Sequence, residues 1–153
     1  MGEAKAIAAG TLVAGTLDLT AACLSSILAG GSAGKVLRFV ASGPFGDAVR
    51  QGGAGAAIAG AAVHYTIMAV IVTIFVLAAR RLPMLIEKPV LWGLSYGLGV
   101  YIVMELVVLP LRWPEMFPVL EPGHIQRAMA FMMLLVGLPI GLIAAHYLRP
   151  IRN

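Results

Sequence analysis

Four side chains that could do chemistry stand inside strongly apolar stretches of this sequence: Asp18, His64, Tyr101 and Glu105. A charged side chain at the centre of a bilayer costs about 3 kcal/mol on insertion scales, so it normally faces protein or water and is paired or protonated. Carboxylates and imidazole are also the groups that exchange protons near neutral pH. We therefore predict that these four residues form an intramembrane polar cluster.

The depth of each group follows from its position, if each apolar stretch is a helix. Counted from the side that holds both termini, Asp18 lies about 18 Å deep, and His64 and Glu105 each lie about 22 Å deep. Each group also shares a helical stripe with small or aromatic residues, and Tyr101 precedes Glu105 by one turn. We expect the three ionisable groups to converge in the bundle core.

Two interpretations of such a cluster stay open. In the structural one, His64 pairs with one carboxylate and the other stays protonated, since low-dielectric surroundings disfavour its charge. In the functional one, the same residues form a proton relay or a cation site, because intramembrane ionisable groups typically mark transport pathways.

Other chemistry has less support. Two carboxylates and an imidazole could bind a divalent ion, but they come from three helices without a local spacing motif, so we predict no metal and no cofactor. Haem ligation by His64 and His146 is disfavoured, since His146 lies near the terminal-side surface. Cys23 is the only cysteine, and no nucleophile motif or phosphate-binding loop is present. We expect no enzymatic activity.

Composition places the chain among polytopic membrane proteins: 60% of its 153 residues are hydrophobic, 12% are charged, and the mean hydropathy is +0.94. Four apolar runs each exceed the roughly 18 residues that cross the hydrocarbon as a helix. We predict an all-α fold, in which residues 1–153 form a single transmembrane domain, an integral membrane four-helix bundle. Its spans are expected at about 6–30, 54–79, 90–111 and 127–148.

The longest connection, residues 31–53, favours a short interfacial helix between spans 1 and 2. Lys35 and Arg38 alternate there with apolar residues that suit the acyl boundary. We expect Gly43-Pro44 to break this helix. A re-entrant lid over the bundle is the alternative, which requires its backbone to be buried in protein. Prolines disfavour a long helix over 111–126.

Small residues predict where the helices meet. The Asp18 stripe of the first span carries glycine, alanine, serine and threonine, so we expect it to face protein. Gly93 and Gly97 form a close-approach motif, and the segment from Gly137 to Gly141 could kink the fourth span. Each half also pairs an acid with a histidine, Asp18 with His64 and Glu105 with His146, which suggests a parallel repeat.

The net charge of +4 is distributed at helix ends, so we predict contact with the lipid bilayer and none with nucleic acid. The compact Arg80-Arg81 pair favours cytoplasmic termini. Asp18 interrupts the apolar run that a signal peptide would need, so we expect the first helix to be retained.

Three segments of the sequence also resemble a known group of membrane proteins. The run Gly10-Thr-Leu-Val-Ala-Gly-Thr-Leu-Asp18, the segment Gly60-Ala-Ala-Val-His64 and the segment from Leu91 to Leu111 resemble small uncharacterised bacterial multi-pass inner-membrane proteins, distantly the YagU-like group. In that group a His stands where Glu105 stands here. The resemblance implies a bacterial inner (plasma) membrane and no mechanism.

Two functions are compatible with these features. The first is proton-linked transport or ion handling, by an oligomer because four helices leave little room for a substrate cavity. The second is an accessory or structural subunit that docks on a larger membrane complex through its small-residue stripes.

Overall fold

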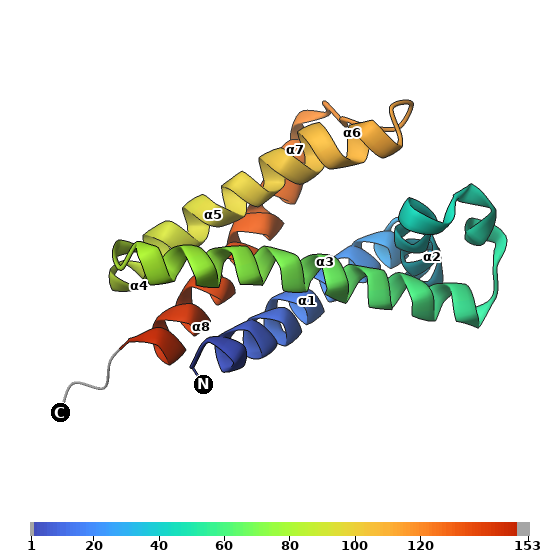
Figure 1. Ribbon diagram of the computed structural model, residues 1–153. Helices are drawn as coiled ribbons and strands as arrows, with labels where there is room; N and C mark the ends of the chain where they lie inside the picture. The colour runs from blue at the N-terminus through green and yellow to red at the C-terminus, as the bar shows by residue number, and fades with distance from the viewer. Residues whose placement is uncertain (1, 150–153) are drawn as a thin grey trace.

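The structure, a computed structural model, describes residues 2–149, and every regular element in that range is a helix (Figure 1). Four helices are long and apolar enough to cross a membrane, which confirms the predicted all-α architecture: Gly2–Leu28, Ala54–Arg81, Pro89–Arg112 and Pro122–Leu148. The elements are α1 (Gly2–Leu28), α2 (Ala33–Phe45), η1 (Asp47–Gln51), α3 (Ala54–Arg81), α4 (Met84–Glu87), α5 (Pro89–Val103), η2 (Met104–Val108), α6 (Leu109–Arg112), α7 (Pro122–Phe131), η3 (Met132–Gly137) and α8 (Leu138–Leu148).

The fourth span begins earlier than expected, at Pro122 instead of residue 127. Proline suits the first helical position, where its missing N–H has no intrahelical partner to lose. The Glu121 carboxylate accepts hydrogen bonds from the backbone N–H groups of Gly123 (2.9 Å) and His124 (2.8 Å), which caps the helix. No long helix runs through 111–126, as the prolines predicted, but α6 ends at Arg112 and α7 begins at Pro122, so both ends of the segment are helical.

Two prolines widen the helices that contain them. Pro110 and Pro139 follow the π-helical segments η2 and η3, and both spans continue past their proline. A proline lacks the N–H that would pair with the carbonyl four residues earlier, so a wider turn re-satisfies the backbone. The segment η3 ends at Gly137, where the stretch expected to kink begins, and η2 contains Glu105.

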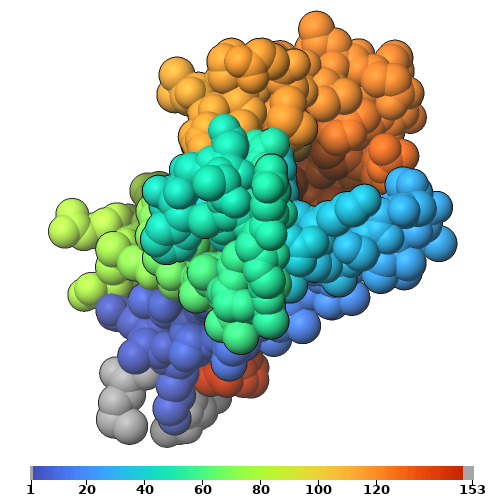
Figure 2. Space-filling model, turned by 90° about the vertical axis from the view of Figure 1, so that its right-hand side faces the viewer, coloured from blue at the N-terminus to red at the C-terminus, as the bar shows by residue number. Residues whose placement is uncertain are grey.

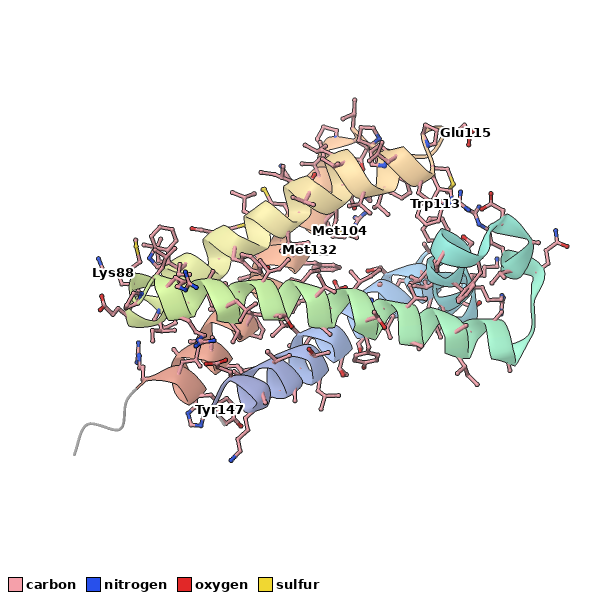
Figure 3. The ribbon with its side chains drawn as sticks, in the orientation of Figure 1. Lys88, Met104, Trp113, Glu115, Met132 and Tyr147 are labelled. Atoms are coloured by element: carbon pink, nitrogen blue, oxygen red, sulfur yellow. The ribbon has the colours of Figure 1, made fainter. Side chains whose placement is uncertain are left out.

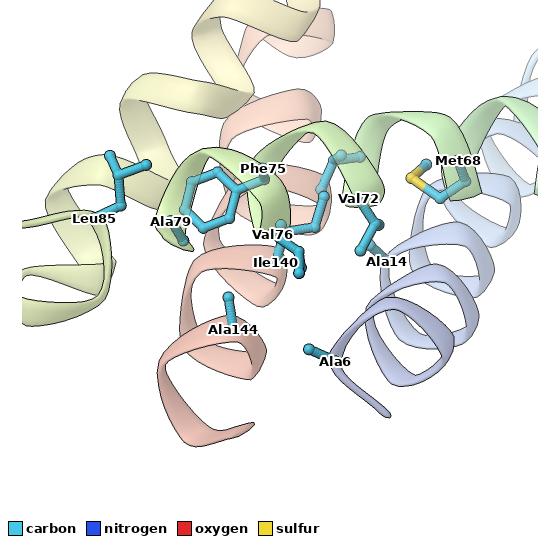
Figure 4. Packing of buried hydrophobic residues seen from close by; sticks show 11 residues of the cluster. Ala6, Ala14, Met68, Val72, Phe75, Val76, Ala79, Leu85, Ile140 and Ala144 are labelled. Carbon is cyan, nitrogen blue, oxygen red and sulfur yellow. The ribbon is translucent and has the colours of Figure 1, made fainter. Parts of the chain in front are cut away.

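The buried apolar core lies in the half of the bundle nearest the termini. Val72, Phe75 and Val76 of α3 pack against Ile140 of α8 and the small residues of α1 (Figure 4). Both described ends of the chain lie at this end of the molecule (Figure 1). The small-residue face of the first span is turned inward, with Ala14 and Gly15 buried, while Leu12, Leu17, Leu24 and Leu28 are exposed.

Glycines set the contact between the third and fourth spans. A Cβ on Gly93 would lie 2.7 Å from the carbonyl oxygen of Gly137, and one on Gly97 would lie 2.7 Å from the Cα of Met133. Gly141 closely approaches the backbone of Pro89. Backbone meets backbone along this line, which confirms the close approach predicted for Gly93 and Gly97.

The helices diverge toward the opposite end, where α5 and α6 separate from α1 and α3 (Figure 1). Here α2 packs on α3, and Gly60 contacts the carbonyl of Leu37 so closely that a Cβ would not fit. The predicted helix in 31–53 is thus present but rests on protein, as the lid alternative requires. The helix ends at Phe45, one residue after Pro44, so the predicted break at Gly43-Pro44 is confirmed to within one residue.

Replacing Gly97 with alanine tests the glycine contact. We expect Gly97→Ala to lower the free energy of unfolding by about 2 kcal/mol, since the added methyl meets the backbone of η3. Gly99→Ala, two residues further, is the matched control because nothing lies within 4 Å of its Cβ position. Thermal unfolding of the detergent-purified proteins measures both, and equal midpoints would contradict the prediction.

Candidate functional site

A cavity of about 420 Å³ occupies the diverging half of the bundle. This is within the range of small-molecule sites, roughly 300–1,000 Å³. Met104, Trp113 and Met132 border the space between α5–α6 and α3 (Figure 3). All four spans and α2 line the cavity: Asp18, Leu19, Ala22, Val36, Phe39, Val40, Gly43, Pro44, Val63, His64, Ile67, Met68, Ile71, Val100, Met104, Val108, Leu109, Arg112, Trp113 and Met132.

The cavity wall is apolar except at two places. Asp18 and His64 lie on one wall and Arg112 lies on another. Seen from the α2 end, the surface is hollowed between the orange residues of α6 and α7 and the blue residues near the end of α1 (Figure 2). The cavity therefore combines an apolar volume with one acid–imidazole pair and, on another wall, one arginine.

Asp18 and His64 face each other across α1 and α3. Nε2 of His64 lies 4.0 Å from Oδ2 of Asp18, and the side chains are 12% (His64) and 16% (Asp18) exposed. The same Nε2 lies 2.9 Å from the carbonyl oxygen of Gly15. A carbonyl can only accept, so Nε2 donates this hydrogen bond and Nδ1 is the atom left to take up or release a proton.

Gly15 explains why α1 and α3 come close enough for this geometry. A Cβ there would lie 2.9 Å from the ring of Tyr65 and 3.3 Å from Cγ of Met68. Tyr65 in turn packs edge-on against the His64 ring and shares a 2.8 Å hydrogen bond with Thr16. The small residue thus places a backbone carbonyl beside the imidazole and fixes the orientation of its ring.

Glu105 has a different partner from the one predicted. Its Oε2 lies 3.8 Å from Nε2 of His124 on α7, and the structure of residues 2–149 contains no single buried cluster of charged groups. The predicted convergence of Asp18, His64 and Glu105 is therefore replaced by two acid–imidazole pairs. The reason is the early start of the fourth span, which brings His124 to the level of η2.

The two pairs occupy related places in the two helical hairpins. Asp18 and Glu105 are each the seventeenth residue of their span, counted from Gly2 and from Pro89. Each acid pairs with a histidine in the first half of the following span. The predicted pairing of Glu105 with His146 is therefore wrong, because Glu105 pairs with His124, and the parallel repeat stays a prediction.

Tyr101 and His146 take no part in either pair. Tyr101 is 8% exposed and lies one turn before Glu105. His146 is exposed and packs edge-on against Tyr147. Sequence reasoning missed His124, although its position two residues after a proline at a helix start was the available signal.

An arginine contact joins α2 to α6 at the edge of the cavity. Arg112 donates hydrogen bonds to the carbonyl oxygens of Ser42 (2.8 Å) and Gly43 (3.0 Å). Trp113 stacks on Phe39 with ring centroids 4.4 Å apart. This α2–α6 contact, which sequence reasoning did not predict, holds α2 across the opening between the diverging helices.

Among residues 2–149, no three His, Cys, Asp or Glu side chains lie close enough to hold a metal ion. The chain matches no family model, no curated protein and no solved structure. The fold and the cavity define its class, a polytopic membrane protein with an internal cavity that carries an acid–imidazole pair.

Arg112→Gln tests the α2–α6 contact. We expect the free energy of unfolding to fall by about 2 kcal/mol, because a charged donor to two backbone carbonyls is lost. Trp113 fluorescence should shift to the red as its ring becomes hydrated. Arg127→Gln, at an exposed position on α7, is the control and should change neither the free energy of unfolding nor the Trp113 fluorescence. An unchanged spectrum for Arg112→Gln would show that the contact does not hold Trp113.

Proposed function

We propose that this protein carries out proton-linked transport across a membrane, with the cavity as the binding site for a largely apolar ligand. One observation supports the proposal above the others: Asp18 and His64 both lie on the wall of a cavity that all four spans line. A pair that only held the bundle together would need no such volume beside it.

The proton would be exchanged at Asp18 and at Nδ1 of His64. Since Nε2 is committed to the Gly15 carbonyl, protonation at Nδ1 makes the ring a cation 4.0 Å from the carboxylate. Loss of either proton changes the charge of the cavity wall by one unit. In low-dielectric surroundings such a change of charge strongly alters the affinity of the cavity for a ligand. Proton exchange is thereby coupled to ligand binding.

The Glu105–His124 pair offers a second proton-exchanging site near the α6–α7 end of the molecule. Its position in a π-helical turn agrees with this role, since π-turns occur frequently at functional sites. We infer a bacterial inner membrane from the resemblance described above, and cytoplasmic termini from the Arg80-Arg81 pair. Ser95, exposed on α5, would suit a homo-oligomeric contact.

Asp18→Asn tests the proposal. Vesicles that contain the protein and a trapped pH indicator are given a potassium diffusion potential, inside negative. We expect wild-type vesicles to admit protons several-fold faster than protein-free vesicles, and Asp18→Asn to return to the protein-free rate, since the amide cannot carry the proton. Glu115→Gln, an exposed carboxylate on the 113–121 loop, should keep the wild-type rate.

The stability of the same variants separates the two roles of the pair. Asp18→Asn should retain the thermal midpoint of the wild type within a few degrees. A large loss of stability with no change in proton entry would contradict transport and support a structural clasp.

The alternative, an accessory subunit of a larger complex, has its own support. Gly53, Gly55 and Gly99 have no neighbour within 4 Å of their Cβ positions, so their backbones are open to close approach by another helix. Mild extraction from native membranes followed by native mass spectrometry tests it. A stoichiometric larger partner would favour this alternative, and a monomer or small homo-oligomer would favour transport.

A further inference from the structure

We propose that the cavity binds an anionic phospholipid of the surrounding bilayer, with one acyl chain in the cavity and the phosphate in an adjoining basic pocket. This inference names the ligand class of the cavity and rests on the proposed function's assignment of that cavity as the ligand site. The basic pocket has a volume of about 380 Å³, and it is lined by Ser26, Lys35, Val36, Phe39 and Arg50.

The two volumes are neighbours. Val36 and Phe39 line both, so these two α2 side chains form the wall that separates the apolar cavity from the basic pocket. One pocket is apolar with few polar groups, and the other offers an ammonium, a guanidinium and a hydroxyl. An amphiphile, with a charged group at one end of an apolar chain, has this same division.

The sign of the charge follows from the residues around the basic pocket. Residues 31–53 contain Lys35, Arg38 and Arg50 but a single carboxylate, Asp47. Asp47 Oδ1 is already shared by Arg50 at 3.0 Å and by Arg112 at 3.3 Å. Within residues 2–149, Lys35 has no carboxylate within 4.0 Å. The local charge is therefore positive, and an anion complements it.

The pocket is also held in place. Arg50 donates from Nε to the hydroxyl of Ser42 at 3.0 Å, and its guanidinium lies 4.9 Å from the centroid of the Phe39 ring. Ser42 is fully buried and donates in turn to the carbonyl of Phe39 at 2.7 Å. The guanidinium is thus fixed beside the same aromatic ring that lines the cavity. Lysine and arginine side chains near a membrane surface attract anionic lipid head groups.

Quenching of Trp113 fluorescence by brominated lipids measures lipid binding in the cavity. Its side chain lines the cavity and the residue is 7% exposed, so bromine atoms on lipids outside the protein reach it poorly. The chain has two tryptophans, and Trp92→Phe leaves Trp113 as the only one. This variant is reconstituted into vesicles that contain acyl-brominated phosphatidylglycerol or acyl-brominated phosphatidylcholine. We expect the anionic lipid to quench Trp113 at several-fold lower mole fraction than the zwitterionic lipid.

Lys35→Gln in the Trp92→Phe background tests the headgroup contact. The preference for the anionic lipid should fall about fivefold, the factor that one cation contributes to the attraction of anionic lipid. Lys88→Gln, an exposed cation before α5 at the opposite end of the bundle, is the matched control and should leave the preference unchanged. Equal quenching by the two lipids, or equal effects of the two substitutions, would overturn the proposal.

Ala22→Phe tests the acyl-chain contact, because Ala22 lines the cavity on α1 and a phenyl ring there would occupy its volume. Quenching by the anionic lipid should fall to the level of the zwitterionic lipid. Val63→Phe, on the α3 wall, provides a second filling variant should the first fail to fold. Quenching that survives in a folded variant would place the lipid on the outer surface and overturn the assignment.

Inorganic phosphate distinguishes a lipid from a soluble anion. Millimolar phosphate should not release the brominated lipid, since it lacks the chain that occupies the cavity, and its release would assign the pocket to a soluble anion instead. Asp18→Asn should leave the lipid preference intact. Lost lipid preference with normal proton entry would thus contradict this inference alone, and absent proton entry with normal lipid preference would contradict the proposed function alone.

Discussion

The contact of backbone with backbone at glycines is the constraint on which the rest of this structure depends. Lipid tails are as apolar as leucine, so membrane helices gain little by hiding apolar side chains from one another and associate where small residues permit close packing. Gly93 and Gly97 of α5 meet Gly137 and Gly141 of the fourth span in this way. Because all four lie in the half of the bundle nearest the termini, that half is closed, and the same helices diverge beyond it.

The cavity is a consequence of this divergence. Where the glycine contact ends, large side chains such as Met104 and Met132 stand between the separating helices without filling the space. The helix α2 then covers the opening, held by Gly60 on one side and by Arg112 on the other. The packing of α2 over the opening places the cations of this segment at the edge of the apolar cavity, where they could contact a bound ligand.

Gly15 connects packing to proton chemistry within the same framework. Its lack of a side chain lets α3 approach α1, and its carbonyl then occupies one nitrogen of His64. The remaining nitrogen and the nearby carboxylate of Asp18 form a pair on the cavity wall. Glu105 and His124 repeat the acid–imidazole combination in the second hairpin, where a π-turn before Pro110 carries the acid.

Much of the architecture was determined by the sequence alone, because hydropathy and helical period depend only on the order of residues. Four spans, the inward face of Asp18 and the close helix approach at Gly93 and Gly97 follow from that order. What the tertiary structure decided was which ionisable groups meet. The depth of Glu105 and the start of the fourth span both depended on how Pro110 and Pro122 are accommodated: one is absorbed by a wider turn, and the other begins a helix capped by Glu121. The presence of a proline disfavours a helix but does not tell whether the proline lies inside the helix or begins it. Only the folded chain could therefore pair Glu105 with His124. The position of α2 over the cavity likewise depends on the tertiary structure.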